Sequence, residues 1–536
     1  MEFENLDHNN NASWAYVGAW LQMRNWFLVL VWAFSFLHGF AQSRLQSGRI
    51  YLDENHNGIY DTGEKPLSNV SVSNGLTIVQ SDEHGLYEIA LRDDGVIFII
   101  KPSGFISDLS KENIFKFFAF HRPEGSPKYK YAGIPTTMLA EHLNFALYPH
   151  PDEKNLKVAL LGDTQVETMD HVFHVAKLVG EQLITEKVDF VIPLGDLVFD
   201  DLDLFDPLKK VLSKIGAPVY YVYGNHDRNY DAMELQNRDE TYKAHFGPSY
   251  YAFNYGDNAF LVLNSVFPEN GTRNFEGKID ADQLKFVENY LNTLPNGVPI
   301  HLFMHIPLEQ VSNVKKLFEL FEAHPNLYVY AGHTHTQYFK EFTRADGWLH
   351  DGPVTELVAG AVCGAWWLGD KDLYGVPSSM MGDGTPKGYW ILDIDASNRT
   401  CTYKISGGDV NKQMHIWTPN EFKDEEGSLD KNEIIVNVFA GNDATEVKVK
   451  IEDGEWLAMQ KVLEPDPFYS KQMRLLEQRG TSDQKMPYYQ PRFPVSQHLW
   501  KIEIPGGMKS GVYDLEVWAR NNIGLDAVSH SLLFMK

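Results

Sequence analysis

The positions of hydrophobic and polar residues follow three different patterns after residue 43. From residue 44 to about residue 150 the apolar runs are short, and Gly, Asn and Asp interrupt them. Examples are the runs at residues 71–73, 76–80, 87–91 and 96–101. Such runs predict β-strands, and no long helical period occurs among them. We therefore expect an N-terminal β-sandwich-like domain over residues 44–150.

Between residues 151 and 415, apolar strands alternate with amphipathic segments. The expected strands are residues 157–161, 190–194, 219–223, 260–264, 301–304, 327–330, 357–362 and 389–394. The expected helices are residues 169–186, 207–215, 282–294 and 311–323. This alternation predicts a layered α/β domain with helices packed on the faces of a sheet.

The β pattern returns after residue 431 and predicts a C-terminal β-sandwich domain over residues 416–536. Turn signals at Asp453-Gly454 and Pro505-Gly506-Gly507 separate strands in a way that fits an immunoglobulin-like sandwich. The expected strands are residues 433–439, 446–451, 499–504 and 513–519. Residues 468–492 mix polar and aromatic side chains, and we expect them to form an insertion loop.

Residues 1–43 form an upstream extension followed by a pattern typical of an export signal. A short basic start at Met23-Arg24 precedes an apolar run over residues 26–37, and Gly39-Phe40-Ala41 offers a cleavage site. The run is too short to span a bilayer, which favours a secretory signal peptide. We expect translation to start at Met23 and the mature chain to be periplasmic, surface-bound or extracellular, with no membrane span after cleavage. An uncleaved anchor or a buried segment is the alternative.

Composition and charge narrow the class of protein. Hydrophobic residues make up 43% of the chain, which is enough for a large core, and the net charge is −25. Nucleic acid binding depends on clustered Lys and Arg, so we expect no nucleic acid partner. Cys363 and Cys401 are the only cysteines. The chain therefore does not depend on a disulfide framework, although one bridge is open to it.

Five polar segments lie just past the ends of expected strands. They are Gly162-Asp163-Thr164-Gln165, Gly195-Asp196, Gly224-Asn225-His226-Asp227, Met304-His305 and Gly332-His333-Thr334-His335. Active-site groups of open α/β sheets gather at the carboxyl ends of the strands, so we expect these segments to meet in one crevice. Carboxylates, a carboxamide and imidazoles together suit a centre of two divalent metal ions.

In this order, the five motifs resemble those of the calcineurin-like metallophosphoesterase superfamily over about half of the chain. The flanking domains resemble those of secreted bacterial members more loosely, through Gly85-Leu86-Tyr87 and residues 363–367 and 382–386. The resemblance implies a central two-sheet α/β sandwich over residues 151–415 as the metallophosphoesterase domain, with an all-β domain on either side.

The resemblance also implies how the motifs act. Asp196 would bridge two divalent metal ions. The other metal ligands would be Asp163, Gln165 and His335 for one ion, and Asn225, His305 and His333 for the other. A metal-bound hydroxide would attack the phosphorus of a phosphomonoester or phosphodiester. His226 would stabilise the phosphoryl charge or protonate the leaving group, and Asp227 would orient His226.

Gln165 departs from the common family pattern, which has histidine at this position. Its amide oxygen is a harder donor than an imidazole nitrogen and favours Mn²⁺, Mg²⁺ or Fe over Zn²⁺. Alternatively, Gln165 would hydrogen-bond a metal-bound water and leave a coordination position open. The candidate metals are therefore Mn, Fe, Zn and Mg.

A structural calcium site is a further candidate, in the N-terminal domain. Residues 53–64 fit the twelve-residue calcium-loop pattern. The candidate ligands are Asp53, Asn55, Asn57, Ile59, Asp61 and Glu64. Strands are expected on both sides of the loop, so it resembles the calcium-bearing turns of bacterial surface β-modules. Asp61 and Glu64 as ordinary turn residues are the alternative.

Arg228, Trp366 and Trp367 are candidates for substrate binding. Arg228 directly follows the third motif, and a guanidinium there could pair with phosphate. A solvated surface arginine is the commoner case. Adjacent tryptophans can shape a substrate mouth, and a plug at a domain interface explains them equally well.

These features predict an exported metal-dependent phosphoesterase that acts on a small-molecule or envelope phosphate ester. A catalytically weakened surface or glycan-binding protein is the alternative, in which Gln165 marks the loss of one metal and the β-domains carry the function. A structural or adhesive surface component is a third interpretation, and the absence of internal repeats counts against it.

Overall fold

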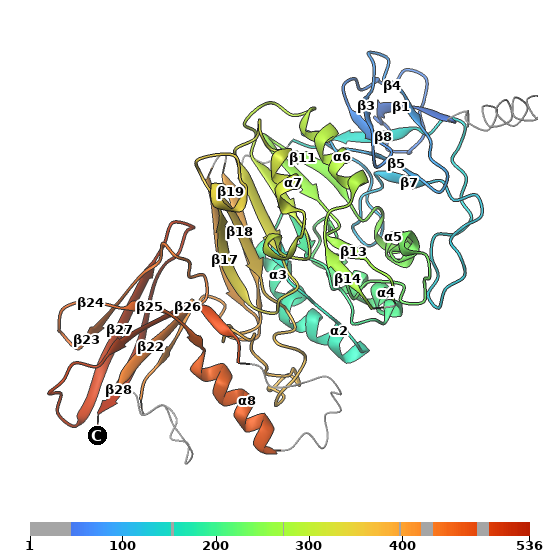
Figure 1. Cartoon of the computed structure of the whole chain (residues 1–536). Helices are drawn as coiled ribbons and strands as arrows, with labels where there is room; N and C mark the ends of the chain where they lie inside the picture. The colour runs from blue at the N-terminus through green and yellow to red at the C-terminus, as the bar shows by residue number, and fades with distance from the viewer. Residues whose placement is uncertain are drawn as a thin grey trace, which may run out of the picture.

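The computed structural model describes residues 44–151, 155–271, 273–395, 398–419, 432–479 and 493–535. An N-terminal β-domain, a central domain of sheets and helices, and a C-terminal β-domain follow one another along the chain (Figure 1). The expected signal peptide at residues 1–43 lies outside the described residues. Within the described ranges, no helix is both long enough and apolar enough to cross a membrane.

Two four-stranded sheets form the N-terminal domain. Their strand orders are β4-β1-β8-β6 and β3-β2-β5-β7. Ile50, Val72 and Phe98 are buried in its core. The strands are β1 Leu45–Leu52, β2 Ser71–Ser73, β3 Ile78–Gln80, β4 Leu86–Ala90, β5 Val96–Ile99, β6 Phe105–Ile106, β7 Phe118–Phe120 and β8 Phe145–Pro149.

Two larger sheets form the middle of the central domain, with the strand orders β10-β9-β19-β20 and β11-β12-β15-β16-β18-β17. A separate hairpin joins β13 to β14. The strands are β9 Asn155–Leu161, β10 Phe190–Pro193, β11 Tyr251–Tyr255, β12 Asn258–Val262, β13 Val266–Pro268, β14 Phe275–Gly277, β15 Ile300–Phe303, β16 Leu327–Ala331, β17 Gln337–Phe342, β18 Val354–Ala359, β19 Gly388–Asp395 and β20 Asn398–Ile405. The α-helices are α2 Met169–Val175, α3 Glu181–Glu186, α4 Phe205–Ser213, α5 Glu240–Phe246, α6 Ala281–Leu291 and α7 Val314–Glu319. Shorter helical turns are η2 Leu202–Leu204, η3 Leu235–Asn237, η4 Leu308–Gln310 and η5 Arg344–Asp346.

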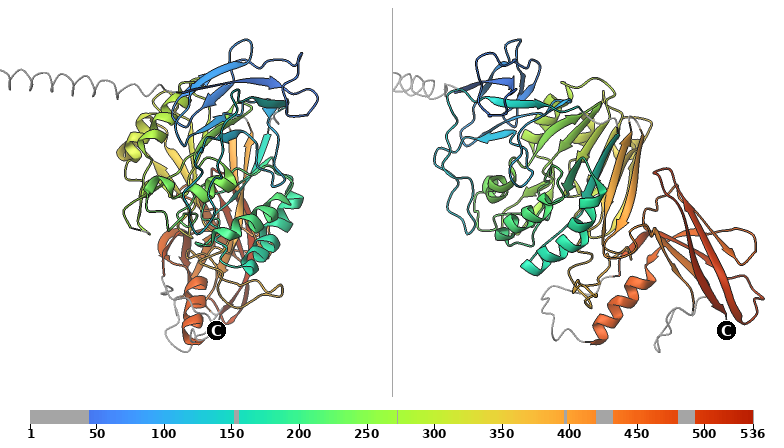
Figure 2. Two further views of the ribbon diagram at one scale, coloured as in Figure 1. Left: turned by 90° about the vertical axis from the view of Figure 1, so that its right-hand side faces the viewer. Right: turned by 180° about the vertical axis from the view of Figure 1, so that it is seen from behind.

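Alternating side chains along β9 explain the layers of this domain. Val158 and Leu160 belong to the core cluster that includes the six-stranded sheet, whereas Ala159 and Leu161 pack with the side chains of α2, α3 and α4. Phe286 of α6 and Phe318 of α7 pack in the cluster of the six-stranded sheet. The central domain is therefore a two-sheet α/β sandwich with helices outside the sheets (Figures 1 and 2).

The described residues of the C-terminal domain form β-strands and one helix, and the domain has a core of its own. Its sheets have the orders β21-β22-β26-β25 and β24-β23-β27-β28, and Val436, Trp500 and Val517 are buried in its core. Its strands are β21 Met414–Trp417, β22 Glu433–Val438, β23 Glu446–Ile451, β24 Leu457–Ala458, β25 Gln460–Pro465, β26 Val495–Glu503, β27 Gly511–Arg520 and β28 Asp526–Met535. The expected domain boundaries near residues 150 and 415 stay predictions.

Two expected elements of the central domain differ in detail. Residues 219–223 run beside β10, yet they form only one bridge pair, between Val191 and Val219. Tyr220 N and Val222 N nevertheless donate to the carbonyl oxygens of Val191 and Pro193, at 2.9 and 3.1 Å, so the segment is hydrogen-bonded to the edge strand β10. The backbone N–H of Val219 donates to Asn113 of the N-terminal domain. The expected helix at residues 169–186 contains a π-helical turn, η1 Ala176–Gly180, between α2 and α3.

The expected insertion loop at residues 468–492 is partly wrong. Its first part lies in a helix, α8 Pro467–Arg479, and its last part lies outside the described residues. Residues 471–478 are mostly strong helix formers, and the helix buries Tyr469 and Met473. Both cysteines are free and buried, so the bridge that the sequence left open is not formed.

Glu356 on β18 gives a pH-dependent test of the central core. Its side chain is fully buried, Oε1 accepts a hydrogen bond from Leu308 N at 2.8 Å, and Oε2 has no partner. Burial raises the pKa of Glu356 to about 8, above the value of about 4.3 in an unfolded chain. The folded state therefore loses stability as the pH rises from about 4.3 to 8.

We expect Glu356→Gln to raise the free energy of unfolding at pH 8 by an amount on the order of 1–3 kcal/mol, which corresponds to a melting temperature several degrees higher. Near pH 4 the two proteins should melt alike, because both side chains are then neutral. Thermal melts at both pH values measure this difference. An equal shift at both pH values would show that packing, rather than ionisation, separates the two proteins.

Candidate metal centre

The five polar segments come together where strands of both sheets end. β9 and β10 are parallel in the smaller sheet, and β15 and β16 are parallel in the larger one. The segments after these strands touch across the two sheets, because the backbone N–H of His333 donates to Asp163 Oδ1 at 2.8 Å. Residues far apart in the sequence therefore share one crevice, as expected for strand ends of this kind.

Asp196, His305 and His333 form a group whose ligand atoms all lie within 4.8 Å of one another. Nε2 of His305 is 3.2 Å from Asp196 Oδ2, 3.0 Å from Asn225 Oδ1 and 3.1 Å from His333 Nδ1. A second group lies beside it, with Nε2 of His335 3.3 Å from Asp163 Oδ2. Asp196 connects the two groups, since Gln165 Nε2 donates to its Oδ2 at 3.0 Å.

Backbone carbonyls fix the tautomers of two histidines. Nδ1 of His305 lies 2.8 Å from the Leu194 carbonyl oxygen, and Nδ1 of His335 lies 2.9 Å from the carbonyl oxygens of Gly364 and Ala365. A carbonyl oxygen only accepts, so each Nδ1 carries the proton. The Nε2 lone pair of each ring is then turned toward the crevice, as in histidines that bind metal.

Two buried oxygen atoms in the crevice have no hydrogen-bond partner, Asp163 Oδ2 and Gln165 Oε1. Their residues are at most 2% exposed. Buried acceptors without partners are costly, and a cation would satisfy both. Oxygen donors beside imidazole nitrogens suit divalent ions such as Mn²⁺, Fe²⁺ and Zn²⁺. The residues therefore fit the metal ions that the motifs imply.

The backbone of the crevice is held in an unusual conformation. Gln165, Asp196, His333 and His335 all have positive φ angles, of 36°, 47°, 74° and 53°. Such angles are strained for these residue types, and strain of this kind clusters at functional sites. At Gly224 a Cβ atom would lie 2.0 Å from the Asp196 backbone nitrogen, so only glycine allows this approach.

Three family models match the chain. They are "N terminal of Calcineurin-like phosphoesterase" over residues 54–132, "Calcineurin-like phosphoesterase" over residues 156–337 and "C terminal of Calcineurin-like phosphoesterase" over residues 356–526. The chain belongs to the calcineurin-like phosphoesterases. It is a metal-dependent phosphoesterase, and divalent metal ions are its cofactors.

Among solved structures, the phosphoesterase is similar to a dimetal phosphatase from Danio rerio. The sequences are 13% identical, the match covers 48% of this chain and 99% of that chain, and the TM-score is 0.32. A search of curated protein sequences found no match.

His226 of the phosphoesterase is oriented by a residue that the motifs did not point to. Its Nδ1 lies 2.7 Å from Asp200 Oδ1, and its ring stacks on Phe199 at 4.6 Å between centroids. Arg273 approaches the other oxygen of the Asp200 carboxylate at 2.9 Å. The only sequence signal for this arrangement was the position of Phe199 and Asp200 just after the second motif.

Asp227 has a different environment from the one expected. Its Oδ1 accepts hydrogen bonds from the N–H groups of Leu197 and Val198, and its Oδ2 accepts one from Gly224. These bonds tie the second motif to the third. The expectation that Asp227 orients the ring of His226 is therefore wrong, because its carboxylate is committed to the backbone and Asp200 takes that place. Burial, and then the charge of Asp196, raise the pKa of Asp227 to about 7.

The two adjacent tryptophans lie in different environments. The ring of Trp366 is 5.0 Å from both the His335 and Phe199 rings, which places it at the edge of the crevice. Trp367 is 7% exposed, and its Nε1 donates to the carbonyl oxygens of Thr164 and Gln165. Trp366 can therefore contact a substrate, whereas Trp367 supports the turn that carries Gln165.

Arg228 does not point at the metal ligands. It is 2% exposed, and its guanidinium donates to the carbonyl oxygens of Arg273 and Asn274 at 3.0 and 3.1 Å. The ring of Phe275 lies 5.1 Å from this guanidinium and 6.0 Å from the ring of His333. The ring of Phe275 therefore lies between Arg228 and His333 of the metal centre.

The C-terminal domain reaches the second metal group through a buried polar network. Gly382 N donates to the His335 carbonyl oxygen at 3.2 Å, and Asp383 accepts from the backbone of Gln337. Asn437 donates to the carbonyl of Asp383 and to Asp466, both at 2.8 Å. The backbone on both sides of Thr336 is therefore fixed by the connection between β18 and β19, and Asn437 of the C-terminal domain holds this connection in turn.

The candidate calcium loop brings its expected residues together in the N-terminal domain. Asn55 Nδ2 and Asn57 Nδ2 both donate to Asp61 Oδ2, at 2.7 and 2.8 Å. Asp53 Oδ2 accepts from Gly58 N at 2.7 Å, and Glu64 Oε2 accepts from Asp61 N at 2.9 Å. The side chain of Ile59 has no donor atom, so only its backbone carbonyl could serve as a ligand.

Proposed function

We propose that this phosphoesterase is an exported enzyme that hydrolyses a phosphate monoester or diester at a centre of two divalent ions. The observation that carries the proposal is the pair of unsatisfied oxygens, Asp163 Oδ2 and Gln165 Oε1, in a crevice lined by imidazoles. Acceptors left without donors in a buried site call for a cation. The site also has an imidazole, His226, outside both donor groups and free to act on a substrate.

Asp196 would bridge the two ions, because its carboxylate lies between the two donor groups. One ion would take Asp163, Gln165 and His335, and the other would take Asn225, His305 and His333. When bound, the ions supply the Lewis acidity that activates water near neutral pH and offsets charge on the phosphoryl group. The free Oε1 of Gln165 supports the amide as a direct ligand, with Nε2 engaged by Asp196.

His226 would act on the substrate through Nε2, because Asp200 holds its Nδ1. A carboxylate 2.7 Å from Nδ1 favours the protonated form of the His226 imidazole. A protonated imidazole can donate to a phosphoryl oxygen and pass a proton to the leaving oxygen. Phe199 and Trp366 would wall the substrate beside this ring.

We expect Gln165→Ala to lower the metal content from two ions per chain toward one, because a ligand of one ion is lost. Gln165→His should keep two ions and shift the preference toward Zn²⁺. Metal analysis after dialysis measures both changes, with the exposed Gln236→Ala as a matched control. Two tightly held ions in Gln165→Ala would contradict a ligand role and would favour a hydrogen bond to water.

The preferred ester is tested with enzyme stripped of metal and refilled with Mn²⁺, Fe²⁺ or Zn²⁺. Rates on an aryl phosphate monoester and on an aryl phosphate diester give kcat/KM for each class, and the larger value identifies the substrate class. A protein that holds one ion or none and cleaves neither ester would instead support the weakened binding protein.

Calcium is the second proposed ligand, because hydrogen bonds bring five of the expected residues together in the loop at residues 53–64, namely Asp53, Asn55, Asn57, Asp61 and Glu64. We expect millimolar Ca²⁺ to raise the melting temperature of the wild-type chain, because binding only to the folded state stabilises it. Asp61→Asn should remove most of this shift, whereas the exposed Glu83→Gln should keep it. A shift that is equal in wild type and Asp61→Asn would place the calcium elsewhere.

Export is the remaining part of the proposal, and it rests on the sequence of residues 23–42. Sequencing the N-terminus of the chain purified from its native host tests it directly. A mature start at Gln42 agrees with cleavage after Ala41, and an intact residue 1 or 23 would contradict it.

A further inference from the structure

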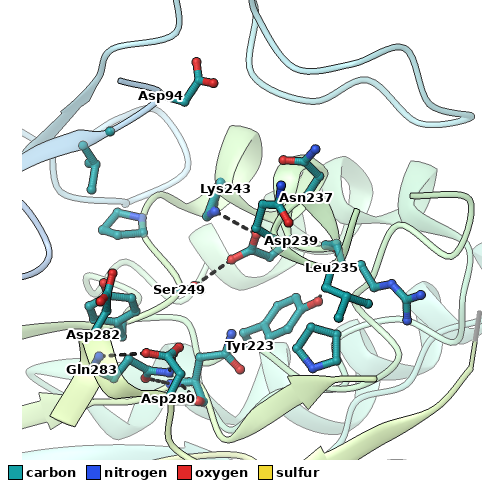
Figure 3. Close-up of a pocket in the computed structure, with 18 of the residues that line it drawn as sticks. Asp94, Tyr223, Leu235, Asn237, Asp239, Lys243, Ser249, Asp280, Asp282 and Gln283 are labelled. Carbon is teal, nitrogen blue, oxygen red and sulfur yellow. Dashed lines mark hydrogen bonds and ion pairs between the residues drawn. The ribbon is translucent and has the colours of Figure 1, made fainter. Parts of the chain in front are cut away.

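A cavity of about 1140 Å³ lies between the N-terminal domain and the central domain (Figure 3). Residues 92–96, 98, 120 and 122 are among those that line it from the N-terminal side, and residues 235–239, 243, 248–250, 266–268 and 280–283 are among those that line it from the central domain. Its volume suits a small molecule. It is distinct from the metal crevice, because none of the expected metal ligands lines it.

The charges of the cavity wall are unusual for this acidic chain. Its lining has six basic and six acidic residues, although the whole chain has 47 basic and 72 acidic ones. Three of the acids are paired inside the wall, Asp282 with Arg92 at 2.8 Å, Asp94 with Arg122 at 3.3 Å and Asp239 with Lys243 at 2.7 Å. The other basic residues of the wall are Arg228, Arg238 and Lys278, and its other acidic residues are Asp93, Glu124 and Asp280.

Two arginines of the wall, Arg228 and Arg238, are nearly completely buried. Arg228 lies against two rings, with its Cζ 4.8 Å from the Tyr230 centroid and 5.1 Å from that of Phe275. Two carbonyl oxygens occupy its Nη atoms, and its Nε has no hydrogen-bond partner. Within the described part of the chain, no carboxylate forms an ion pair with Arg228.

Arg238 adds a second positive charge nearby. Its Nη2 donates to the carbonyl oxygen of Gly271 at 2.6 Å. Burial, and then the charge of Arg228, lower the pKa of Arg238. Two cations that repel each other at the wall of a cavity would both be stabilised by one anion between them.

We propose that this cavity binds a small molecule that carries a tetrahedral oxyanion, with Arg228 and Arg238 as its receptor. A guanidinium has five N–H donors in a flat fork that matches two oxygens of a phosphate or similar group. Two of the five donors of Arg228 are engaged by carbonyls, which leaves others for an anion. Tyr250 and Phe267 in the same wall offer apolar contact to the body of the ligand.

The position of the arginines links this site to the catalytic histidine. The carbonyls that Arg228 and Arg238 hold belong to Gly271, Arg273 and Asn274, in the connection between β13 and β14. Arg273 in the same connection pairs with Asp200, which in turn holds His226. An oxyanion at the two arginines therefore acts on the backbone that positions the His226–Asp200 pair.

The test is calorimetric titration of the metal-loaded protein with inorganic phosphate and, separately, with phenylphosphonate. We expect two bound phosphates per wild-type chain, one at the metals and one in the cavity. Arg238→Gln should weaken one of the two sites at least tenfold and leave the other unchanged, and Asp257→Asn, at an exposed position outside the cavity wall, should keep both. Tighter binding of phenylphosphonate than of phosphate in the arginine-dependent site identifies an organic ligand, and equal binding identifies the free oxyanion.

A single bound phosphate in the wild-type chain would overturn the proposal without any variant. Two phosphate sites whose affinities are unchanged in both Arg238→Gln and Arg228→Lys would also overturn it. The lysine variant keeps the positive charge while it removes the flat fork, so it provides a folded comparison if the glutamine variant is unstable. A circular dichroism melt of each variant establishes which proteins are folded under the titration conditions.

Discussion

Asp196→Asn is expected to abolish hydrolysis, with a loss on the order of 10³-fold or more in kcat/KM. The carboxylate lies between the two donor groups, 3.0 Å from Gln165 Nε2 and 3.2 Å from His305 Nε2. An amide in its place keeps the shape and removes the negative charge that would hold two cations together. Steady-state kinetics and metal analysis on the same sample measure both consequences.

The matched control for this experiment is Asp203→Asn, which changes an exposed aspartate in η2. It should retain wild-type activity and metal content. If Asp196→Asn keeps both ions and a rate within tenfold of wild type, Asp196 is not a bridging ligand. In that case the centre would have to form from the two donor groups independently.

His226→Gln is expected to lower kcat by about 10²- to 10⁴-fold, the range typical for loss of a general acid. Metal content should stay at the wild-type level, because His226 belongs to neither donor group. Asp200→Asn should have a smaller effect, on the order of 10- to 100-fold, because it removes only the partner that orients the ring. Kinetics with metal-loaded proteins measure this order of effects.

Asp227→Asn distinguishes the expected structural role of Asp227 from the orientation of His226 by Asp200. The carboxylate of Asp227 accepts three backbone hydrogen bonds, so its loss should lower the melting temperature more than kcat. A loss of kcat in Asp227→Asn that exceeds that in Asp200→Asn would contradict the orientation of His226 by Asp200. A His226→Gln enzyme with wild-type kcat would remove His226 from the reaction altogether.

The metal crevice could be foreseen because local sequence already encodes it. Each expected ligand segment follows an apolar run, and four of the five segments begin with a glycine directly before the ligand residues. The structure gives the reason at Gly224, where a Cβ atom would collide with the backbone of Asp196. The two-sheet sandwich was foreseen only through the resemblance of the motifs to a known superfamily, because the continuous apolar run of β9 at residues 158–161 does not distinguish the two faces that the structure separates.

Contacts between distant segments could not be foreseen in the same way. Asp200 looks like an ordinary turn residue in the sequence, and only the fold brings it against His226, 26 positions later. Trp366 and Trp367 are neighbours in sequence, yet only one of them lies at the edge of the crevice. The helix α8 was not predicted, because helix formers occupy only the first part of the mixed segment at residues 468–492.

The most direct test of the central claim is the number of metal ions that the wild-type chain needs for hydrolysis. Protein stripped of metal is titrated with Mn²⁺, while bound metal and hydrolysis of an aryl phosphate ester are followed together. We predict no turnover in the stripped protein and full turnover only when two ions are bound per chain. Full turnover without metal, or with a single ion bound, would contradict a two-metal phosphoesterase.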